Sequence, residues 1–127
     1  MFPFCLYLRH YIFPEKTRPN KLKTLSMYAI DIKTCHEIYG NLLAKYAVYE
    51  DRQICAGGEK GKDSCEDDSG AGLISKVKDG NESGRYKLVG YVSWGLINCA
   101  TEGYPGVYVK VAFFLEWILD NLREFIL

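Results

Sequence analysis

Hydrophobic and polar positions alternate in several short stretches of this chain, and its end has a helical spacing. Alternation predicts strands, and it occurs at residues 21–32, 73–77, 86–94 and 106–111. A further strand is expected between Leu6 and Ile12. Near the end, apolar residues recur at every third or fourth position, so residues 112–125 should form an amphipathic helix. Several short strands followed by one helix favour an all-β barrel over βαβ units.

Turn-forming residues separate the predicted strands and mark the loops. Residues 79–84, Asp-Gly-Asn-Glu-Ser-Gly, predict a hairpin loop. Residues 57–72 are rich in glycine and acidic side chains and should form a long loop. Residues 31–40 are expected to form a short helical turn that carries Cys35 and ends at Gly40.

Composition and charge narrow the classes of function. Sixteen basic residues balance sixteen acidic ones, which argues against a protein that binds nucleic acid by neutralising phosphates. The apolar start from Met1 to Leu8 is much shorter than the roughly 20 residues that cross a bilayer. It also lacks the basic region and the cleavage site of a convincing signal peptide. We therefore expect neither nucleic acid nor a membrane as partner.

The five cysteines are an odd number, so one must be free, pair with another chain or lack its partner. The chain has no Cys-x-x-Cys motif, and neither His10 nor His36 has the spacing of a ligand pair, so no metal site is expected. Disulfides are the better interpretation, and they indicate an oxidising compartment. Spacing alone does not choose among the pairings.

Ser69 lies in an acidic loop that could carry chemistry. A serine on a tight loop, flanked by acidic residues and Gly70, could be a nucleophile. Clusters of Asp, Ser and Gly are more often plain turns, because their side chains satisfy local backbone groups. A calcium loop is a third interpretation, but the required alternation of Asp residues is absent.

A series of motifs along the chain decides between these interpretations. The motifs are Ile54-Cys55-Ala56-Gly57-Gly58, Asp63-Ser64-Cys65, Asp68-Ser69-Gly70, Val92-Ser93-Trp94-Gly95, Cys99 and Gly103-Tyr104-Pro105-Gly106-Val107-Tyr108. In order and spacing they resemble the C-terminal half of a trypsin-like serine protease of the chymotrypsin family, most closely the arthropod clip-domain or digestive type. The resemblance covers residues 21 to 122. It implies a partial chymotrypsin-like C-terminal β-barrel of Greek-key type with a C-terminal α-helix, formed by residues 21–127, after an unmatched segment at residues 1–20.

The resemblance implies a catalytic role for one residue and a supporting role for two others. Ser69 matches the nucleophile, which needs a histidine base held by an aspartate. Asp68 matches the buried acid that pairs with a new N-terminus after activation cleavage. The oxyanion region would comprise Asp67, Asp68 and Ser69, but the family has glycine where Asp67 stands. Losing an oxyanion donor costs about 10²–10³ in rate, so Asp67 predicts weakened catalysis.

The resemblance also implies a substrate-binding pocket. Asp63 matches the base of the pocket, where a carboxylate would select Arg or Lys side chains. Gly95 and Gly106 match the pocket walls, where the missing side chains leave room for a long basic residue. Ser93, Trp94 and Gly95 match the strand that pairs with the substrate backbone.

Two disulfides follow from the resemblance, Cys35–Cys55 and Cys65–Cys99, and Cys5 is then left over. Helix 112–125 matches the family's terminal helix, so its apolar face is expected to pack on the barrel. The family's barrel has six strands, of which roughly four are matched here. If residues 4–12 do not fill part of the gap, an open sheet edge should make the chain prone to associate.

The rest of the catalytic triad has no match in this chain. Neither His10 nor His36 lies in the family's histidine motif, and neither Asp31 nor Asp51 matches the triad aspartate. One hypothesis is therefore a serine-type endopeptidase with an Arg/Lys pocket that is inactive as this isolated chain. The alternative hypothesis is a non-catalytic protease homologue that acts as a binding or regulatory module.

Partners and compartment follow from the family. We expect a protein or peptide substrate, with other proteases or inhibitors as further partners, and no cofactor. The family and the disulfides indicate secretion to the extracellular space. Asn81-Glu82-Ser83 is a candidate N-glycosylation acceptor at the predicted hairpin tip.

Overall fold

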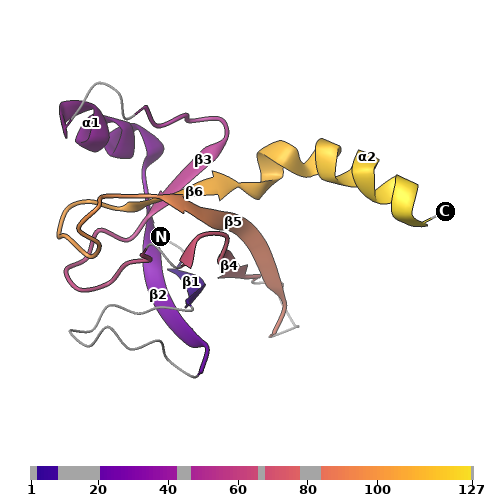
Figure 1. Ribbon diagram of the computed structural model, residues 1–127, viewed down its shortest axis with the longest axis horizontal. Helices are drawn as coiled ribbons and strands as arrows, with labels where there is room; N and C mark the ends of the chain where they lie inside the picture. Colours follow the sequence, from indigo (N-terminus) through magenta and orange to yellow (C-terminus); the bar gives the residue numbers. More distant parts are fainter. Residues whose placement is uncertain (1–2, 9–20, 43–46, 66–67, 78–83, 127) are drawn as a thin grey trace.

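Six antiparallel strands close into a barrel in the computed structural model of the chain (Figure 1). The structure describes residues 3–8, 21–42, 47–65, 68–77 and 84–126. The strands are β1 (Pro3–Leu8), β2 (Lys23–Ile30), β3 (Gln53–Ala56), β4 (Gly72–Lys76), β5 (Tyr86–Trp94) and β6 (Gly106–Lys110). Around the barrel they follow the order β1-β2-β3-β6-β5-β4. The expected all-β fold, a chymotrypsin-like C-terminal barrel followed by a helix, is confirmed.

Strand β1 closes the barrel by pairing on both of its sides. Its Cys5 lies opposite Ser26 of β2 and opposite Ile74 of β4. The strand expected at Leu6–Ile12 therefore begins earlier, at Pro3, and residues 9–20 lie outside the described part. Among the described strands no sheet edge is left open, so the expected association through such an edge has no basis here.

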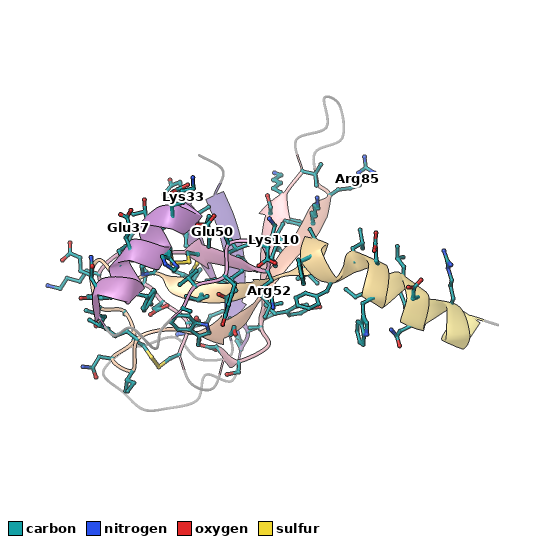
Figure 2. The ribbon with its side chains drawn as sticks, turned by 90° about the horizontal axis from the view of Figure 1, so that it is seen from above. Lys33, Glu37, Glu50, Arg52, Arg85 and Lys110 are labelled. Atoms are coloured by element: carbon teal, nitrogen blue, oxygen red, sulfur yellow. A yellow bond between two sulfur atoms is a disulfide. The ribbon has the colours of Figure 1, made fainter. Side chains whose placement is uncertain are left out.

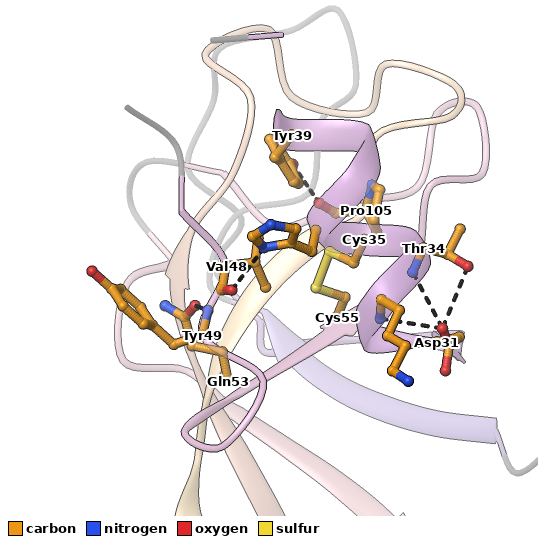
Figure 3. The surroundings of a disulfide bond; sticks show 11 residues. Asp31, Thr34, Cys35, Tyr39, Val48, Tyr49, Gln53, Cys55 and Pro105 are labelled. Carbon is orange, nitrogen blue, oxygen red and sulfur yellow. Dashed lines mark hydrogen bonds between the residues drawn. A yellow bond between two sulfur atoms is a disulfide. The ribbon is translucent and has the colours of Figure 1, made fainter. Parts of the chain in front are cut away.

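Helix α1 (Ile32–Leu42) lies against the outside of the barrel beside β3 (Figure 1). Its first turn is capped by Asp31, whose Oδ2 accepts hydrogen bonds from the N–H groups of Lys33 and Thr34, both at 3.2 Å (Figure 3). The helix does not end at Gly40 as expected, but continues to Leu42. Glycine weakens a helix by only about 1 kcal/mol, which packing of the helix can offset.

Two clusters of buried side chains form the core. The first fills the barrel and consists of Leu25, Met27, Ala56, Leu73 and Tyr108. The second lies under α1 and consists of Cys35, Tyr39, Val48, Cys55 and Val107. The disulfide between Cys35 and Cys55 joins α1 to β3 within the second cluster (Figure 3). These two cysteines are a pair that the family resemblance implies.

The chain ends in the 3₁₀ helix η2 (Val111–Phe114) and helix α2 (Leu115–Ile126). The predicted helix at 112–125 is confirmed, but the expected packing of its apolar face on the barrel is wrong. Figures 1 and 2 both show α2 projecting away from the barrel, and Trp117 is 67% exposed. Among the described residues, neither α1 nor α2 has the length and apolar character that crossing a membrane requires.

Candidate functional site

A cavity of about 310 Å³ contains most of the residues expected to form the site. It lies between the loop that precedes β4, the end of β5 and the loop that follows β5. Its lining consists of Asp63, Ser64, Cys65, Ser69, Val92, Ser93, Trp94, Gly95, Leu96, Ile97 and Cys99. The structure thus brings together the candidate nucleophile and the candidate pocket carboxylate, which are six positions apart in the sequence.

Asp63 is held at the cavity by two backbone groups. Its Oδ1 accepts a hydrogen bond from the N–H of Ser64 at 2.8 Å, and its Oδ2 accepts one from the N–H of Ala100 at 2.9 Å. The residue is only 8% exposed. Burial raises the pKa of the Asp63 carboxyl above its usual value, although the two N–H donors partly oppose this. The carboxylate is therefore fixed in position and poorly hydrated, which favours binding of a cationic group.

Gly95 and Gly106 face each other. A Cβ placed on Gly95 would lie 3.8 Å from the Cα of Gly106. A Cβ placed on Gly106 would lie 2.9 Å from the hydroxyl oxygen of Tyr108. Gly95 lines the cavity and Gly106 does not. The absent side chain of Gly106 leaves room for the ring of Tyr108.

Tyr108 lies in the barrel core directly below the cavity. Its hydroxyl group is 3.4 Å from the Sδ of Met27. Burial raises the pKa of Tyr108 above its usual value. The tyrosine therefore stays neutral.

The rim of the cavity is tied to the loop of Asp63 by the disulfide between Cys65 and Cys99. The next residue, Ala100, has a φ of 60°, which a residue with a side chain rarely adopts. This conformation accompanies the hydrogen bond from the Ala100 N–H to Asp63. The Thr101 hydroxyl also donates to the Asn98 carbonyl at 2.7 Å, so short local bonds fix the rim.

Trp94 packs against an aromatic residue of α1. The rings of Trp94 and Tyr39 meet edge to face, with centroids 4.8 Å apart. The Tyr39 hydroxyl donates a buried hydrogen bond to the Pro105 carbonyl (Figure 3). Burial and the nearby Asp63 carboxylate raise the pKa of Tyr39 to about 12. Helix α1 therefore supports the wall of the cavity that Trp94 forms.

Ser69 is exposed at the mouth of the cavity, in a turn that Asp68 organises. Asp68 is buried, and its Oδ2 accepts a hydrogen bond from the Cys65 N–H at 2.9 Å. Gly70 follows with a φ of 82° and donates its N–H to the Val92 carbonyl of β5 at 3.1 Å. Asp67, the remaining residue of the expected oxyanion region, lies outside the described residues, as does Asn81.

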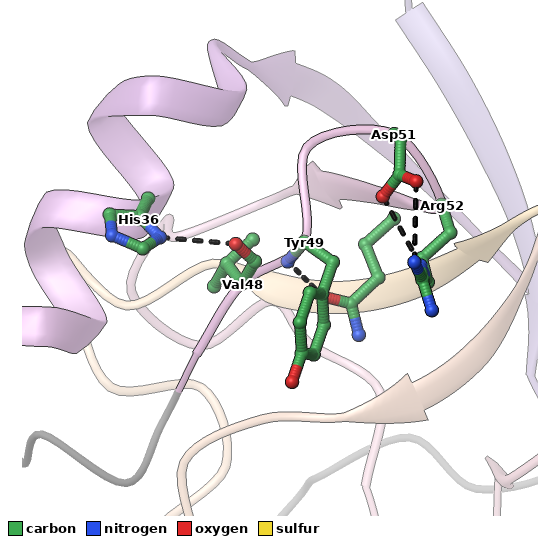
Figure 4. A network of polar contacts seen from close by, with 6 residues as sticks. His36, Val48, Tyr49, Asp51 and Arg52 are labelled. Atoms are coloured by element: carbon green, nitrogen blue, oxygen red, sulfur yellow. Dashed lines mark hydrogen bonds and ion pairs between the residues drawn. The ribbon is translucent and has the colours of Figure 1, made fainter.

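No histidine lines the cavity among the described residues. The Nδ1 atom of His36 is 3.0 Å from the Val48 carbonyl oxygen on the loop after α1 (Figure 4). The carboxylate of Asp51 pairs with Arg52 at 3.2 Å (Figure 4). His10 lies outside the described residues. Nor do the described residues contain any group of three or more His, Cys, Asp or Glu side chains able to hold a metal ion.

Sequence reasoning missed three contributors to the site. Leu96 and Ile97 line the cavity, and Ala100 binds Asp63. Their place on the loop between two matched motifs was the one available signal. Apolar loop residues follow no period, and a backbone N–H contributes nothing to the pattern of side chains.

Known proteins have sequences related to this chain. The family described as Trypsin matches residues 11–118. Phenoloxidase-activating factor 3 of Holotrichia diomphalia is 39% identical over 85% of this chain, and Glucanase inhibitor protein 3 of Phytophthora infestans is 42% identical over 84%. Inactive CLIP domain-containing serine protease A8 of Anopheles gambiae is 40% identical over 78%.

These alignments cover 29%, 36% and 26% of the three relatives, so the chain spans about a third or less of their length. Within that part, the closed barrel, the terminal helix, the two disulfides and the serine loop beside a buried aspartate all agree with the family match. The chain therefore belongs to the trypsin family of serine proteases.

Proposed function

We propose that this chain binds a protein or peptide by receiving one Arg or Lys side chain in the cavity, and does not cleave it. The observation that supports this is the buried carboxylate of Asp63, held by two N–H groups in a cavity that Gly95 also lines. A guanidinium or ammonium group there would form a charge-assisted hydrogen bond in a poorly hydrated place. Ser93 to Gly95 would pair with the backbone of the same peptide.

Cleavage requires a base that the described site lacks. A serine hydroxyl is a weak nucleophile until a neighbouring histidine accepts its proton. The Nδ1 of His36 is engaged with the Val48 carbonyl, and no histidine lines the cavity among the described residues. Asp67 would add negative charge beside the oxyanion that forms during acyl transfer. The chain alone is thus expected to bind but not to hydrolyse.

A second candidate is an active endopeptidase in which this chain is one part. Ser69 favours it, because the residue is exposed at the cavity mouth where a scissile carbonyl would lie. The relatives are named both ways, one as an activating factor and one as an inactive protease. In both cases we propose an extracellular location, since the two disulfides need an oxidising compartment. Proteases and their inhibitors remain the proposed partners.

Two assays on the purified chain separate these functions. The first assay measures binding of p-aminobenzamidine, an aromatic amidinium, by the fluorescence of this ligand. Asp63→Asn should weaken the binding at least about tenfold. Hydrolysis of an arginyl ester and labelling by a fluorophosphonate are measured for the natural chain and for Ser69→Ala. Binding without hydrolysis or labelling supports the binding module. Labelling that Ser69→Ala abolishes would establish an active serine and overturn the proposal.

A further inference from the structure

Ile97 holds a large apolar side chain in solvent at the edge of the cavity. It is 83% exposed, the highest value among the large apolar side chains of the described residues. It nevertheless belongs to the lining of the cavity, as does its neighbour Leu96. Apolar surface in water favours binding of a ligand that covers it. Ile97 is therefore placed to contact the part of a ligand that remains outside the cavity.

The loop that carries Ile97 is fixed by short local contacts. The carbonyl oxygen of Ile97 lies 3.8 Å from the Sγ of Cys99, which a disulfide ties to Cys65. The next carbonyl, that of Asn98, accepts the hydrogen bond from the Thr101 hydroxyl at 2.7 Å. A ligand that covers Ile97 would not have to order this loop, so more of the apolar contact would contribute to affinity.

The cavity thus offers two different contacts at two depths. The carboxylate of Asp63 is buried, whereas the side chain of Ile97 is exposed at the edge. A ligand with a cation alone would use only the first contact. On the basis of the cation-binding function proposed above, we propose that Ile97 makes the cavity selective for an Arg or Lys residue that apolar residues precede in the peptide.

The order of residues in the peptide follows from the sheet. The described strands all pair antiparallel, and a peptide that pairs with Ser93 to Gly95 in the same way runs opposite to β5. Leu96 and Ile97 follow Gly95 in the chain. The peptide residues beside them therefore come before the residue whose side chain enters the cavity next to Gly95.

Three peptides that displace p-aminobenzamidine from the full chain test this selectivity. Acetyl-Leu-Leu-Arg amide should bind about fivefold more tightly than acetyl-Ser-Ser-Arg amide, the gain expected from covering roughly half of an isoleucine side chain. Acetyl-Arg-Leu-Leu amide has the same composition as the first peptide, but its apolar residues follow the arginine. It should bind no more tightly than the serine peptide.

Variants of Ile97 test which residue makes the contact. Ile97→Ser should reduce the preference for the Leu-Leu-Arg peptide to less than about twofold, while binding of p-aminobenzamidine stays nearly unchanged. Ile97→Leu keeps an apolar side chain and should keep the preference. Leu22→Ser is the matched control, because Leu22 is 67% exposed but does not line the cavity. This variant should behave like the natural chain.

The outcomes separate the role of Ile97 from the binding of the cation. Equal affinity of the natural chain for the Leu-Leu-Arg and Ser-Ser-Arg peptides overturns the role of Ile97, and so does a preference that survives Ile97→Ser. Tighter binding of the Arg-Leu-Leu peptide overturns the proposed direction. In each of these cases p-aminobenzamidine would still bind through Asp63. Binding that Asp63→Asn does not weaken would instead overturn the cation-binding function, and the selectivity with it.

Discussion

The Oδ2 atom of Asp63 accepts a hydrogen bond from the N–H of Ala100 at 2.9 Å, across 37 residues of chain. This bond joins a carboxylate that lines the cavity to the loop after β5, next to the disulfide between Cys65 and Cys99. The carboxylate is thereby fixed before any ligand arrives, and a bound cation would not have to order it. Preorganisation of this kind increases affinity by lowering the cost of binding.

Binding of an amidinium should depend on pH through Asp63. Burial raises the pKa of this carboxyl above its usual value, and only the ionised form attracts a cation. Affinity for p-aminobenzamidine should therefore fall as pH decreases through the raised pKa, at a higher pH than an exposed aspartate would require. Fluorescence titrations from neutral pH downwards measure this. Asp63→Asn should bind weakly with no such dependence, and an unchanged profile in that variant would assign the titration to another group.

The raised pKa of Asp63 favours binding at high pH but favours the stability of the fold at low pH. A carboxyl whose pKa is raised in the folded state holds its proton more tightly when folded. Its contribution to stability is full at low pH and is lost as pH rises from the unfolded to the folded pKa. Asp63→Asn has no carboxyl to titrate and should not lose this contribution. As pH rises through this interval, the free energy of unfolding of the variant should therefore increase relative to that of the natural chain. Urea melts at several pH values check the trend.

Alanine substitutions at Gly95 and Gly106 should have different effects, the first on binding and the second on stability. Gly106→Ala would place a Cβ 2.9 Å from the buried Tyr108 hydroxyl oxygen, and such overpacking costs about 1–3 kcal/mol. Gly95→Ala meets only an ordinary contact of 3.8 Å. It should keep the stability but narrow the cavity and weaken amidinium binding. Thermal melts and fluorescence titrations of both variants test this, and equal loss of stability in the two would contradict it.

Removing each disulfide should have a different effect on binding. The loops span 20 residues for Cys35–Cys55 and 34 for Cys65–Cys99, and chain entropy gives about 3–4 kcal/mol for each. Paired Cys→Ala variants should lose that much in urea melts. Once folded, the Cys35/Cys55 variant should still bind p-aminobenzamidine, because that disulfide lies under α1. The Cys65/Cys99 variant should bind weakly, since the rim that holds Ala100 is released.

The sequence predicted those parts of the fold whose periodicity is long enough to read. The nine residues of β5 are enough to indicate a strand, and the predicted and observed bounds agree. Strand β3 has only four residues, too few to show a period, and it was not predicted. The exposure of α2 could not be predicted either, because a stripe such as Leu115, Leu119 and Leu122 indicates an apolar contact without telling what makes it.

For the site, the motifs predicted side chains but not the backbone groups that bind them. The placement of Asp63 and Ser69 at one cavity was expected from the motifs, and both residues line it. The role of Ala100 could not be expected, because its contribution is an N–H group turned by a φ of 60°. A backbone donor depends on local conformation, and no residue type encodes it.

Tyr39→Phe should lower the stability of the fold but leave binding in the cavity nearly unchanged. The change removes the bond to the Pro105 carbonyl and leaves that buried oxygen without its partner, which costs about 1–3 kcal/mol. The ring contact with Trp94 remains, so binding of p-aminobenzamidine should change little.

The natural chain should also lose stability as pH rises from 10 to about 12, because burial raises the pKa of Tyr39 to about 12 and the unfolded phenol ionises first. Urea melts across this range should show a smaller loss in Tyr39→Phe, with Tyr49→Phe, at an exposed tyrosine, as the control that behaves like the natural chain.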